Sequence, residues 1–282
     1  MNKERQDKIR GALFGVAVGD ALGGPLEFMS AEEIQKKHGR VTEIMGGGWL
    51  DLEPGETTDD TAMTLAVAEG ILEEPDSPYQ EIGERFIDWY HSGPKDIGVA
   101  CATSIRNAIG NGRDWFNAAA QTQKAQGRPV EGNGALMRTI YPALYYTAED
   151  QRRTITRGIA MMTHFGQQSA NTCEEYVEAV HAAINGEMVH MRFTPGAEPT
   201  GYVVDSYNVA VESIIQARSF ADALIKAVNR GGDADTIGAI CGGLAGAMYG
   251  YSQIPRRWLD ALDETTKMRL DILAAQANQQ HE

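Results

Sequence analysis

The sequence predicts an all-α protein, a single compact bundle of many helices, on three observations. Apolar residues recur at the three- and four-residue spacing of amphipathic helices along most of the 282 residues. Period-two alternation, the sign of a strand, is absent except for a short ambiguous run over residues 41–45. No repeat, heptad seam or proline-rich linker marks a boundary. We therefore expect residues 1–282 to form one domain, although a prior of ~150 residues per domain would give two.

The first expected helix covers residues 5–22, where apolar side chains share one face. A second row on this segment consists of three glycines four residues apart, Gly11, Gly15 and Gly19. Because these positions carry no side chain, another helix can approach closely along them. Gly23, Gly24 and Pro25 then end the helix, since glycine suits a left-handed cap and proline cannot continue the hydrogen-bond ladder.

Short Gly, Pro or Asn breaks separate the remaining expected helices, and the two longest loops fall near residues 40–56 and 187–201. In chain order these helices cover residues 63–74, 79–92, 97–110, 114–125, 135–146, 149–163, 168–185, 203–217, 220–229, 236–249 and 258–279. The weakly polar stretch from Ile237 to Tyr249 is shorter than the ~20 residues that span a bilayer. It predicts a buried helix and no membrane insertion.

Charge and cysteine content argue against several classes of protein. The 25 Lys and Arg residues against 39 Asp and Glu residues give a net charge of −14, which repels nucleic acid and anionic lipids. The three cysteines are far apart, with no CxxC pair, and indicate neither a disulfide framework nor a structural zinc. The N-terminal apolar run is interrupted by Asp20, which favours a helix over a signal peptide. We expect a reduced, cytoplasmic protein, and a monomer.

Two acidic segments each stand just before an expected helix, Thr58-Asp59-Asp60 and Asp233-Ala234-Asp235-Thr236. A single carboxylate there would cap the helix and complement its dipole, for about 1 kcal/mol. Capping needs one side chain, however, whereas each segment supplies three that carry oxygen. Such oxygens suit a hard divalent cation, which would also neutralise four converging carboxylates. The spacing does not establish that the segments meet, so capping and metal binding are both open interpretations.

Other polar residues also have a structural and a functional interpretation. Asp20 lies in the last turn of its helix, where the dipole disfavours a carboxylate. Glu27, just after the Gly-Gly-Pro stop, is either a solvated loop acid or a catalytic one. Residues 132–134 (Gly-Asn-Gly) form either a simple turn or a site where backbone N–H groups hold phosphate. His164, at the end of an expected helix, is by default a capping residue.

The same segments, in the same order over residues 10–250, resemble the motifs of the ADP-ribosylglycohydrolases. The matching motifs are Gly19-Asp20-x-x-Gly23 with Glu27, Thr57-Thr58-Asp59-Asp60-Thr61-x-Met63, Gly132-Asn133-Gly134-x-x-Met137-Arg138, Thr163-His164, Gly201-Tyr202-Val203-x-Asp205-Ser206 and Asn229-Arg230-Gly231-Gly232-Asp233-x-Asp235-Thr236. The resemblance implies an all-α orthogonal bundle whose central cleft holds two divalent cations, Mg²⁺ or Mn²⁺. It implies two sets of metal ligands, Thr58, Asp59 and Asp60 in one and Asp233, Asp235 and Thr236 in the other.

The resemblance also implies roles in substrate binding and catalysis. Gly132, Asn133 and Gly134 would line a diphosphate, with His164 near the ribose or phosphate and Tyr202 in the pocket. The acids with catalytic roles would be Glu27, Asp96, Asp59 and Asp60, of which Asp96 would face a guanidinium leaving group.

The reaction that the resemblance implies is hydrolysis of the N-glycosidic bond of ADP-ribosyl-arginine on a protein, through an oxocarbenium-like state. One alternative is cleavage of O-linked ADP-ribose from serine or from an acyl ester. Others are a family member that binds ADP-ribose without turnover, and a two-metal phosphoesterase.

Overall fold

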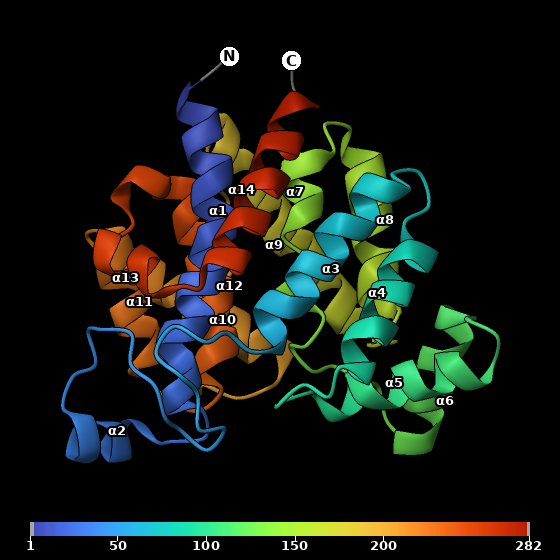
Figure 1. The fold of residues 1–282 in the computed structure, drawn as a ribbon, viewed down its shortest axis with the longest axis horizontal. Coiled ribbons are helices and arrows are strands. Elements are labelled where there is room, and N and C mark those ends of the chain that lie inside the picture. The colour runs from blue at the N-terminus through green and yellow to red at the C-terminus, as the bar shows by residue number, and fades with distance from the viewer. Residues whose placement is uncertain (1–2, 281–282) are drawn as a thin grey trace.

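Helices run through the whole of the computed structural model, which describes residues 3–280 (Figure 1). Within these residues the chain forms fourteen α-helices, three short 3₁₀-helices and three isolated bridges, and no β-strand. The all-α prediction is confirmed. The α-helices are α1 (Lys3–Gly23), α2 (Ala31–His38), α3 (Asp59–Glu73), α4 (Tyr79–His91), α5 (Val99–Gly110), α6 (Trp115–Gln126), α7 (Tyr141–Tyr145), α8 (Glu149–Met161), α9 (Gln167–Asn185), α10 (Val203–Ile215), α11 (Phe220–Val228), α12 (Ala234–Tyr249), α13 (Arg256–Ala261) and α14 (Glu264–Gln279). The 3₁₀-helices are η1 (Gly24–Leu26), η2 (Leu136–Arg138) and η3 (Tyr251–Gln253).

Helix α2 was not predicted, although its start carries a recognisable signal. The Ser30 side chain accepts a hydrogen bond from the Glu33 N–H, and the Glu33 side chain accepts one from the Ser30 N–H. This reciprocal pair is a capping box, and its Ser-x-x-Glu spacing is visible in the sequence. Residues 41–45, the ambiguous run, form no strand.

Two expected helices are each interrupted in the structure. The segment 135–146 consists of η2 and α7, because Pro142 lacks an N–H and is tolerated only in the first turn of a new helix. The segment 258–279 consists of α13 and α14. Between them the Asp263 side chain accepts a hydrogen bond of 2.9 Å from the Thr266 N–H, which starts α14 as a separate helix.

Helices α1 and α12 pass each other in backbone contact near the middle of the molecule (Figure 1). The predicted glycine row on α1 faces a second row on α12, with Gly11 against Gly246, Gly15 against Gly242 and Gly19 against Gly238. A Cβ atom at any of these positions would overlap backbone atoms across the contact. The order of the pairs shows that the helices are antiparallel. The C-terminal end of α1, with Asp20, therefore meets the N-terminal end of α12, with Asp235.

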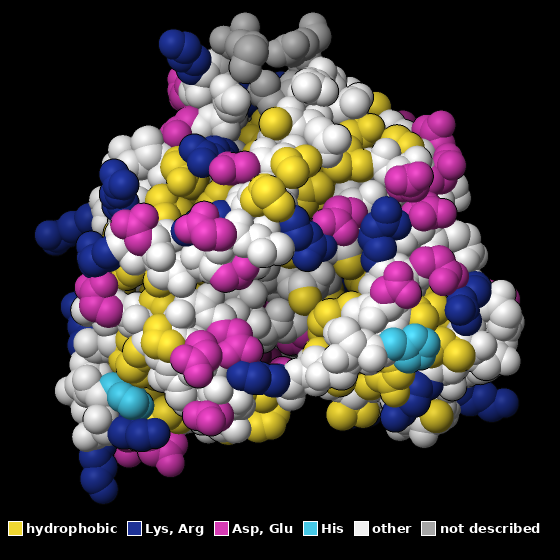
Figure 2. Space-filling model, in the orientation of Figure 1, with side chains coloured by type: hydrophobic (Ala, Val, Ile, Leu, Met, Phe, Trp, Pro, Cys, Tyr) yellow, Lys and Arg dark blue, Asp and Glu magenta, His cyan; other side chains and the backbone are white. Residues whose placement is uncertain are grey.

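The other helices pack around this pair to enclose the hydrophobic core. Helices α9, α10 and α11 pack on α12, α14 packs on α1, α3 packs on α4, and α5 packs on α6. Figure 1 shows α10 to α13 on one side of the molecule and α3 to α6 with α8 on the other. Figure 2 shows the same face hollowed at its lower edge, between these two sides. Among the described residues, every helix is too short or too polar to cross a lipid bilayer.

Replacing a glycine of the α1–α12 contact should weaken the fold. We expect Gly15→Ala to lower the free energy of unfolding by about 1–3 kcal/mol, because the methyl group would overlap the Gly242 carbonyl and force the helices apart. Urea unfolding of the full chain measures the difference. The matched control is Gly110→Ala at the end of α5, where an added methyl group meets open space. Equal stability of the two variants would contradict the assigned role of the glycine rows.

Candidate active site

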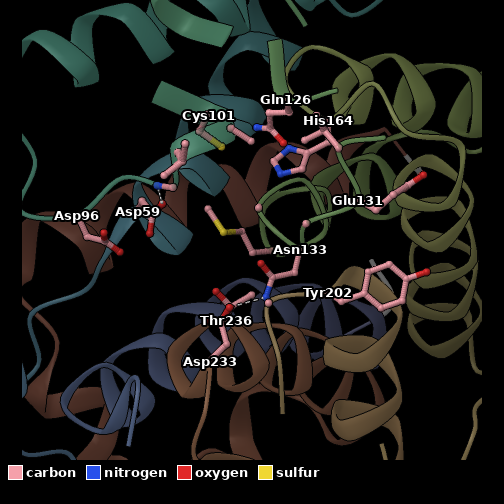
Figure 3. Close-up of a pocket in the computed structure, with 18 of the residues that line it drawn as sticks. Asp59, Asp96, Cys101, Gln126, Glu131, Asn133, His164, Tyr202, Asp233 and Thr236 are labelled. Atoms are coloured by element: carbon pink, nitrogen blue, oxygen red, sulfur yellow. Dashed lines mark hydrogen bonds between the residues drawn. The ribbon is translucent and has the colours of Figure 1, made fainter. Parts of the chain in front are cut away.

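A cleft lies where the ends of several helices and their loops meet. Its volume is about 700 Å³, within the range of small-molecule sites. Its lining comes from residues 27–28, 59, 96, 98–101, 126, 128–134, 137, 164, 168, 201–202, 233 and 235–236. Figure 3 shows Asp59 and Asp96 on one wall, Asp233 and Thr236 below them, and His164 and Tyr202 on the far side. Most of the residues predicted for the site therefore share one cavity.

Short backbone bridges hold the loops around the cleft in register. Ser30 pairs with Gly231 and Gly132 pairs with Tyr202, each as an isolated antiparallel bridge. The Asp233 N–H donates to the Pro199 carbonyl at 3.1 Å. The turn before Asp233 needs two glycines, because residues 231 and 232 have φ angles of +72° and +66° and each lies against backbone of a neighbouring loop. These contacts fix the position of the backbone next to Asp233.

The two acidic segments, whose meeting the sequence left open, are in direct contact. The Thr236 hydroxyl donates a hydrogen bond of 3.3 Å to Asp60 Oδ2, which joins the start of α12 to the start of α3. The carboxylates of Glu27, Asp233 and Asp235 have oxygen atoms within 4.8 Å of one another. Glu27 is therefore not a solvated loop acid but one member of the acidic cluster.

Asp20 explains how the start of α3 is held. Its buried carboxylate accepts hydrogen bonds of 3.0 Å from the Thr58 N–H and hydroxyl and of 3.1 Å from the Thr61 N–H, as well as one from the Thr61 hydroxyl. A carboxylate that opposes the dipole of its own helix thus complements the N-terminus of α3 instead. Thr58 and Asp60 lie beneath the cleft surface, and Asp59 beside them faces the cleft.

Burial and mutual repulsion disfavour full ionisation of the carboxylates in the acidic cluster. Burial, followed by the charges of neighbouring carboxylates, raises the pKa of Glu27 to about 8 and that of Asp59 to about 7. The same causes, in the same order, raise the pKa values of Asp60 and Asp235 well above the usual range. No Lys or Arg pairs with these four carboxylates among the described residues.

The donor set of this cluster fits a divalent cation. Every candidate ligand is a carboxylate or hydroxyl oxygen, the chemistry that Mg²⁺ and Mn²⁺ prefer. Within residues 3–280, Asp60 Oδ1 is buried and has no hydrogen-bond partner, which is costly unless something else neutralises it. The residues that could hold cations are the six predicted ones together with Glu27, whose carboxylate lies beside Asp233 and Asp235.

The glycine-rich loop at residues 132–134 forms the wall next to His164. A Cβ atom on Gly134 would lie 3.0 Å from His164 Cε1, so glycine leaves room for the imidazole ring. The Asn133 side chain donates a hydrogen bond of 2.9 Å to Asp233 Oδ2 (Figure 3) and another of 2.9 Å to Ser206 Oγ. Asn133 thus ties this loop to the acidic cluster.

His164 is a buried residue of the cleft wall. Its ring contributes to the lining of the cleft, and Nδ1 lies 2.8 Å from Thr163 Oγ1. Burial, with a smaller contribution from the charge of Arg138, lowers the pKa of His164 to about 3. The imidazole is therefore neutral throughout the physiological range, and the default interpretation of a helix-capping residue does not describe it.

An aromatic pair at the mouth of the cleft was missed from the sequence. Trp49 Nε1 donates a hydrogen bond of 2.7 Å to Glu27 Oε2. The ring of Phe28 lies 5.4 Å from the Trp49 ring and is 69% exposed, and Phe28 has a φ of +63°, unusual for a bulky residue. Both side chains lie at loop positions that no periodic pattern identifies. Asp96 is half-buried and Tyr202 exposed at the same opening.

The chain is similar to known proteins over nearly its full length. It matches the family described as ADP-ribosylglycohydrolase over residues 1–197 and 188–282. The ADP-ribosyl-[dinitrogen reductase] glycohydrolase of Rhodospirillum rubrum is 35% identical over 91% of this chain and 90% of the relative. The ADP-ribosylarginine hydrolase Tri1 of Serratia proteamaculans (strain 568) is 31% identical over 97% of this chain and 79% of the relative. A solved structure titled ADP-ribosylglycohydrolase-related protein complex superposes with a TM-score of 0.81 at 30% identity, covering 98% and 99% of the two chains.

Removing the carboxylate that holds α3 should cost more stability than removing an ordinary helix cap. We expect Asp20→Ala to lower the free energy of unfolding by about 2 kcal/mol or more, because it leaves buried donors of Thr58 and Thr61 without a partner. The control is Asp114→Ala, which removes an exposed cap of α6 and should cost about 1 kcal/mol. Calorimetry measures the free energy of unfolding of both variants. An equal decrease in the two would contradict the role given to Asp20.

Proposed function

The chain belongs to the ADP-ribosylglycohydrolase family, and on this basis we propose that it hydrolyses the N-glycosidic bond between ADP-ribose and a modified arginine of a protein. The Rhodospirillum and Serratia relatives are named as ADP-ribosyl hydrolases, which supports a hydrolase activity of this kind for the chain. The preference for arginine is the further step. It is supported by the name of the Serratia relative, an ADP-ribosylarginine hydrolase, and by the Asp96 carboxylate at the opening of the cleft.

The contact between the two acidic segments carries the proposal. We propose that two divalent cations, Mg²⁺ or Mn²⁺, bind there, with Thr58, Asp59 and Asp60 on one side and Asp233, Asp235 and Thr236 on the other. Bound cations would lower the pKa of a water molecule, which would then lose a proton more readily and act as the nucleophile. They would also stabilise negative charge on the ribose oxygens. The unpartnered Asp60 Oδ1 and the raised pKa values of Asp60 and Asp235 support this assignment.

Backbone groups and side chains of the opposite wall would bind and orient the substrate. The glycines at 132 and 134 leave backbone exposed beside the neutral ring of His164, an arrangement that can accept a diphosphate without a basic side chain. Tyr202, paired through its backbone with Gly132, presents an exposed aromatic ring at the same wall. The ribose next to the scissile bond would then lie towards the acidic cluster.

Carboxylates on both sides of the scissile bond suit this reaction. Cleavage of a glycosidic bond passes through an oxocarbenium-like state, whose positive charge the acidic cluster would stabilise. Glu27, oriented by Trp49, is the carboxylate that we assign to accept a proton from the attacking water, once bound cations have offset the burial and repulsion that raise its pKa. Asp96 is assigned to the guanidinium, because a planar carboxylate can accept two parallel hydrogen bonds from it. The leaving arginine would depart past Phe28 at the mouth.

Release of ADP-ribose from ADP-ribosyl-arginine protein tests the function. We expect release with Mg²⁺ or Mn²⁺, none after chelation, and recovery when metal is restored. Asp59→Ala and Asp235→Ala should each reduce the rate by about 100-fold or more, because each removes a carboxylate from the metal-binding set. The matched control is Asp88→Ala, an exposed acid on α4, which should keep the wild-type rate.

Each outcome of this assay has a defined meaning. Activity that survives in Asp59→Ala and Asp235→Ala would contradict the proposed site. Faster release from serine-linked or O-acyl-linked ADP-ribose would keep the hydrolase and contradict the preference for arginine. Binding of ADP-ribose with no release from any linkage would indicate a non-catalytic family member.

Metal binding should also be visible in stability, independently of activity. In the presence of a chelator, Asp60→Asn should be at least as stable as the wild type, because it removes a buried charge among like charges. With Mn²⁺ at 100 times its Kd, the wild type should gain about 2.7 kcal/mol for each cation bound. The variant should gain much less. Thermal unfolding with and without Mn²⁺ measures both effects, and an equal gain in the two proteins would exclude Asp60 as a ligand.

A further inference from the structure

We propose that Arg138 and Thr163 are positioning residues that hold His164 as the neutral tautomer with its proton on Nε2. The ring then presents an N–H donor to an oxygen atom of the substrate. This inference rests on the proposed function only for the identity of that substrate, ADP-ribose. The tautomer itself follows from hydrogen bonds that the described residues make.

Arg138 begins the chain of interactions. Its side chain is fully buried, and Nη2 donates hydrogen bonds to Thr163 Oγ1 at 2.7 Å and to the Ile159 carbonyl at 3.2 Å. Nη1 donates to the Gly134 carbonyl at 2.6 Å, so the same guanidinium also holds the glycine-rich loop. A guanidinium has donors and no acceptor. Thr163 Oγ1 must therefore accept the hydrogen bond from Arg138.

Because Thr163 Oγ1 accepts from Arg138, its own hydrogen atom is free to be donated to a neighbour. A threonine hydroxyl has one hydrogen atom, and two neighbours could receive it. His164 Nδ1 lies 2.8 Å from Thr163 Oγ1, whereas Cys101 Sγ lies 4.0 Å away and is a weak acceptor. The hydroxyl therefore donates to Nδ1, which must carry a lone pair. Burial and the charge of Arg138, which lower the pKa of His164, disfavour a second proton, so the single ring proton resides on Nε2.

The Nε2 edge faces the glycine-rich loop and the cleft. A Cβ atom on Gly132 would lie 3.2 Å from Nε2, so the absence of a side chain there leaves room beside this edge of the ring. Figure 3 shows the ring on the wall across from Asp233 and Thr236. Ligand oxygens of a diphosphate or ribose accept hydrogen bonds. The Nε2–H tautomer attracts such an oxygen, whereas the other tautomer would present a lone pair and repel it.

The tautomer can be read directly from ¹⁵N-histidine NMR of the full chain. We expect the His164 signals, identified by their loss in His164→Gln, to show an unprotonated Nδ1 and a protonated Nε2. Thr163→Val, which keeps the shape and removes the hydroxyl, should shift the ring towards a mixture of tautomers. Thr163→Ser restores the hydroxyl and should return the wild-type pattern. A protonated Nδ1 in the wild type would overturn the proposal.

Calorimetric titration with ADP-ribose, in the presence of Mn²⁺, provides the second measurement. Thr163→Val should bind about 10- to 100-fold more weakly than the wild type, the effect of losing one hydrogen bond to a charged group, and Thr163→Ser should bind like the wild type. Unchanged tautomer and affinity in Thr163→Val would overturn the positioning role. If Thr163→Val fails to fold, the wild-type spectrum still decides the tautomer. If the wild type does not bind ADP-ribose, the proposed function fails while the tautomer is still decided.

Discussion

The site depends on the backbone contact between α1 and α12. Glycines on both helices allow a separation that any side chain would prevent, and the antiparallel order brings the end of α1 to the start of α12. Asp20 on α1 then holds the N-terminus of α3, and α12 carries Asp235 and Thr236. Three helix ends that are far apart in the sequence thereby place their carboxylates in one cluster. The same contact that packs the core therefore sets the geometry of the acidic cleft.

The chemistry follows from how unevenly charge is distributed around the cleft. One wall holds buried carboxylates whose pKa values are raised by burial and by one another, a state that a bound cation would relieve. The other wall holds glycines and a neutral imidazole, with the buried cation Arg138 behind it. The net charge of −14 therefore does not argue against a diphosphate ligand, because under the proposed function such a ligand would contact this wall rather than the average surface.

Local patterns in the sequence predicted the parts of the structure that depend on local physics. Helical periodicity gave the fold class, the glycine row on α1 indicated a close helix partner, and the surplus of oxygen ligands before two helices indicated a metal site. The Ser30–Glu33 capping box would have given α2 by the same logic. Contacts between distant segments could not be predicted in this way. The bond from Trp49 to Glu27, the role of Asp20 and the arrangement behind His164 depend on tertiary packing, which a single sequence does not encode as a spacing.

The central claim is that the acidic segments of α3 and α12 form one metal centre that faces an ADP-ribose site. Anomalous diffraction from crystals grown with Mn²⁺ and ADP-ribose tests it most directly. The account predicts anomalous density enclosed by Asp59, Asp60, Asp233 and Asp235, with the diphosphate lying along Gly132 to Gly134. Manganese bound elsewhere on the protein, or no manganese at these carboxylates, would contradict it.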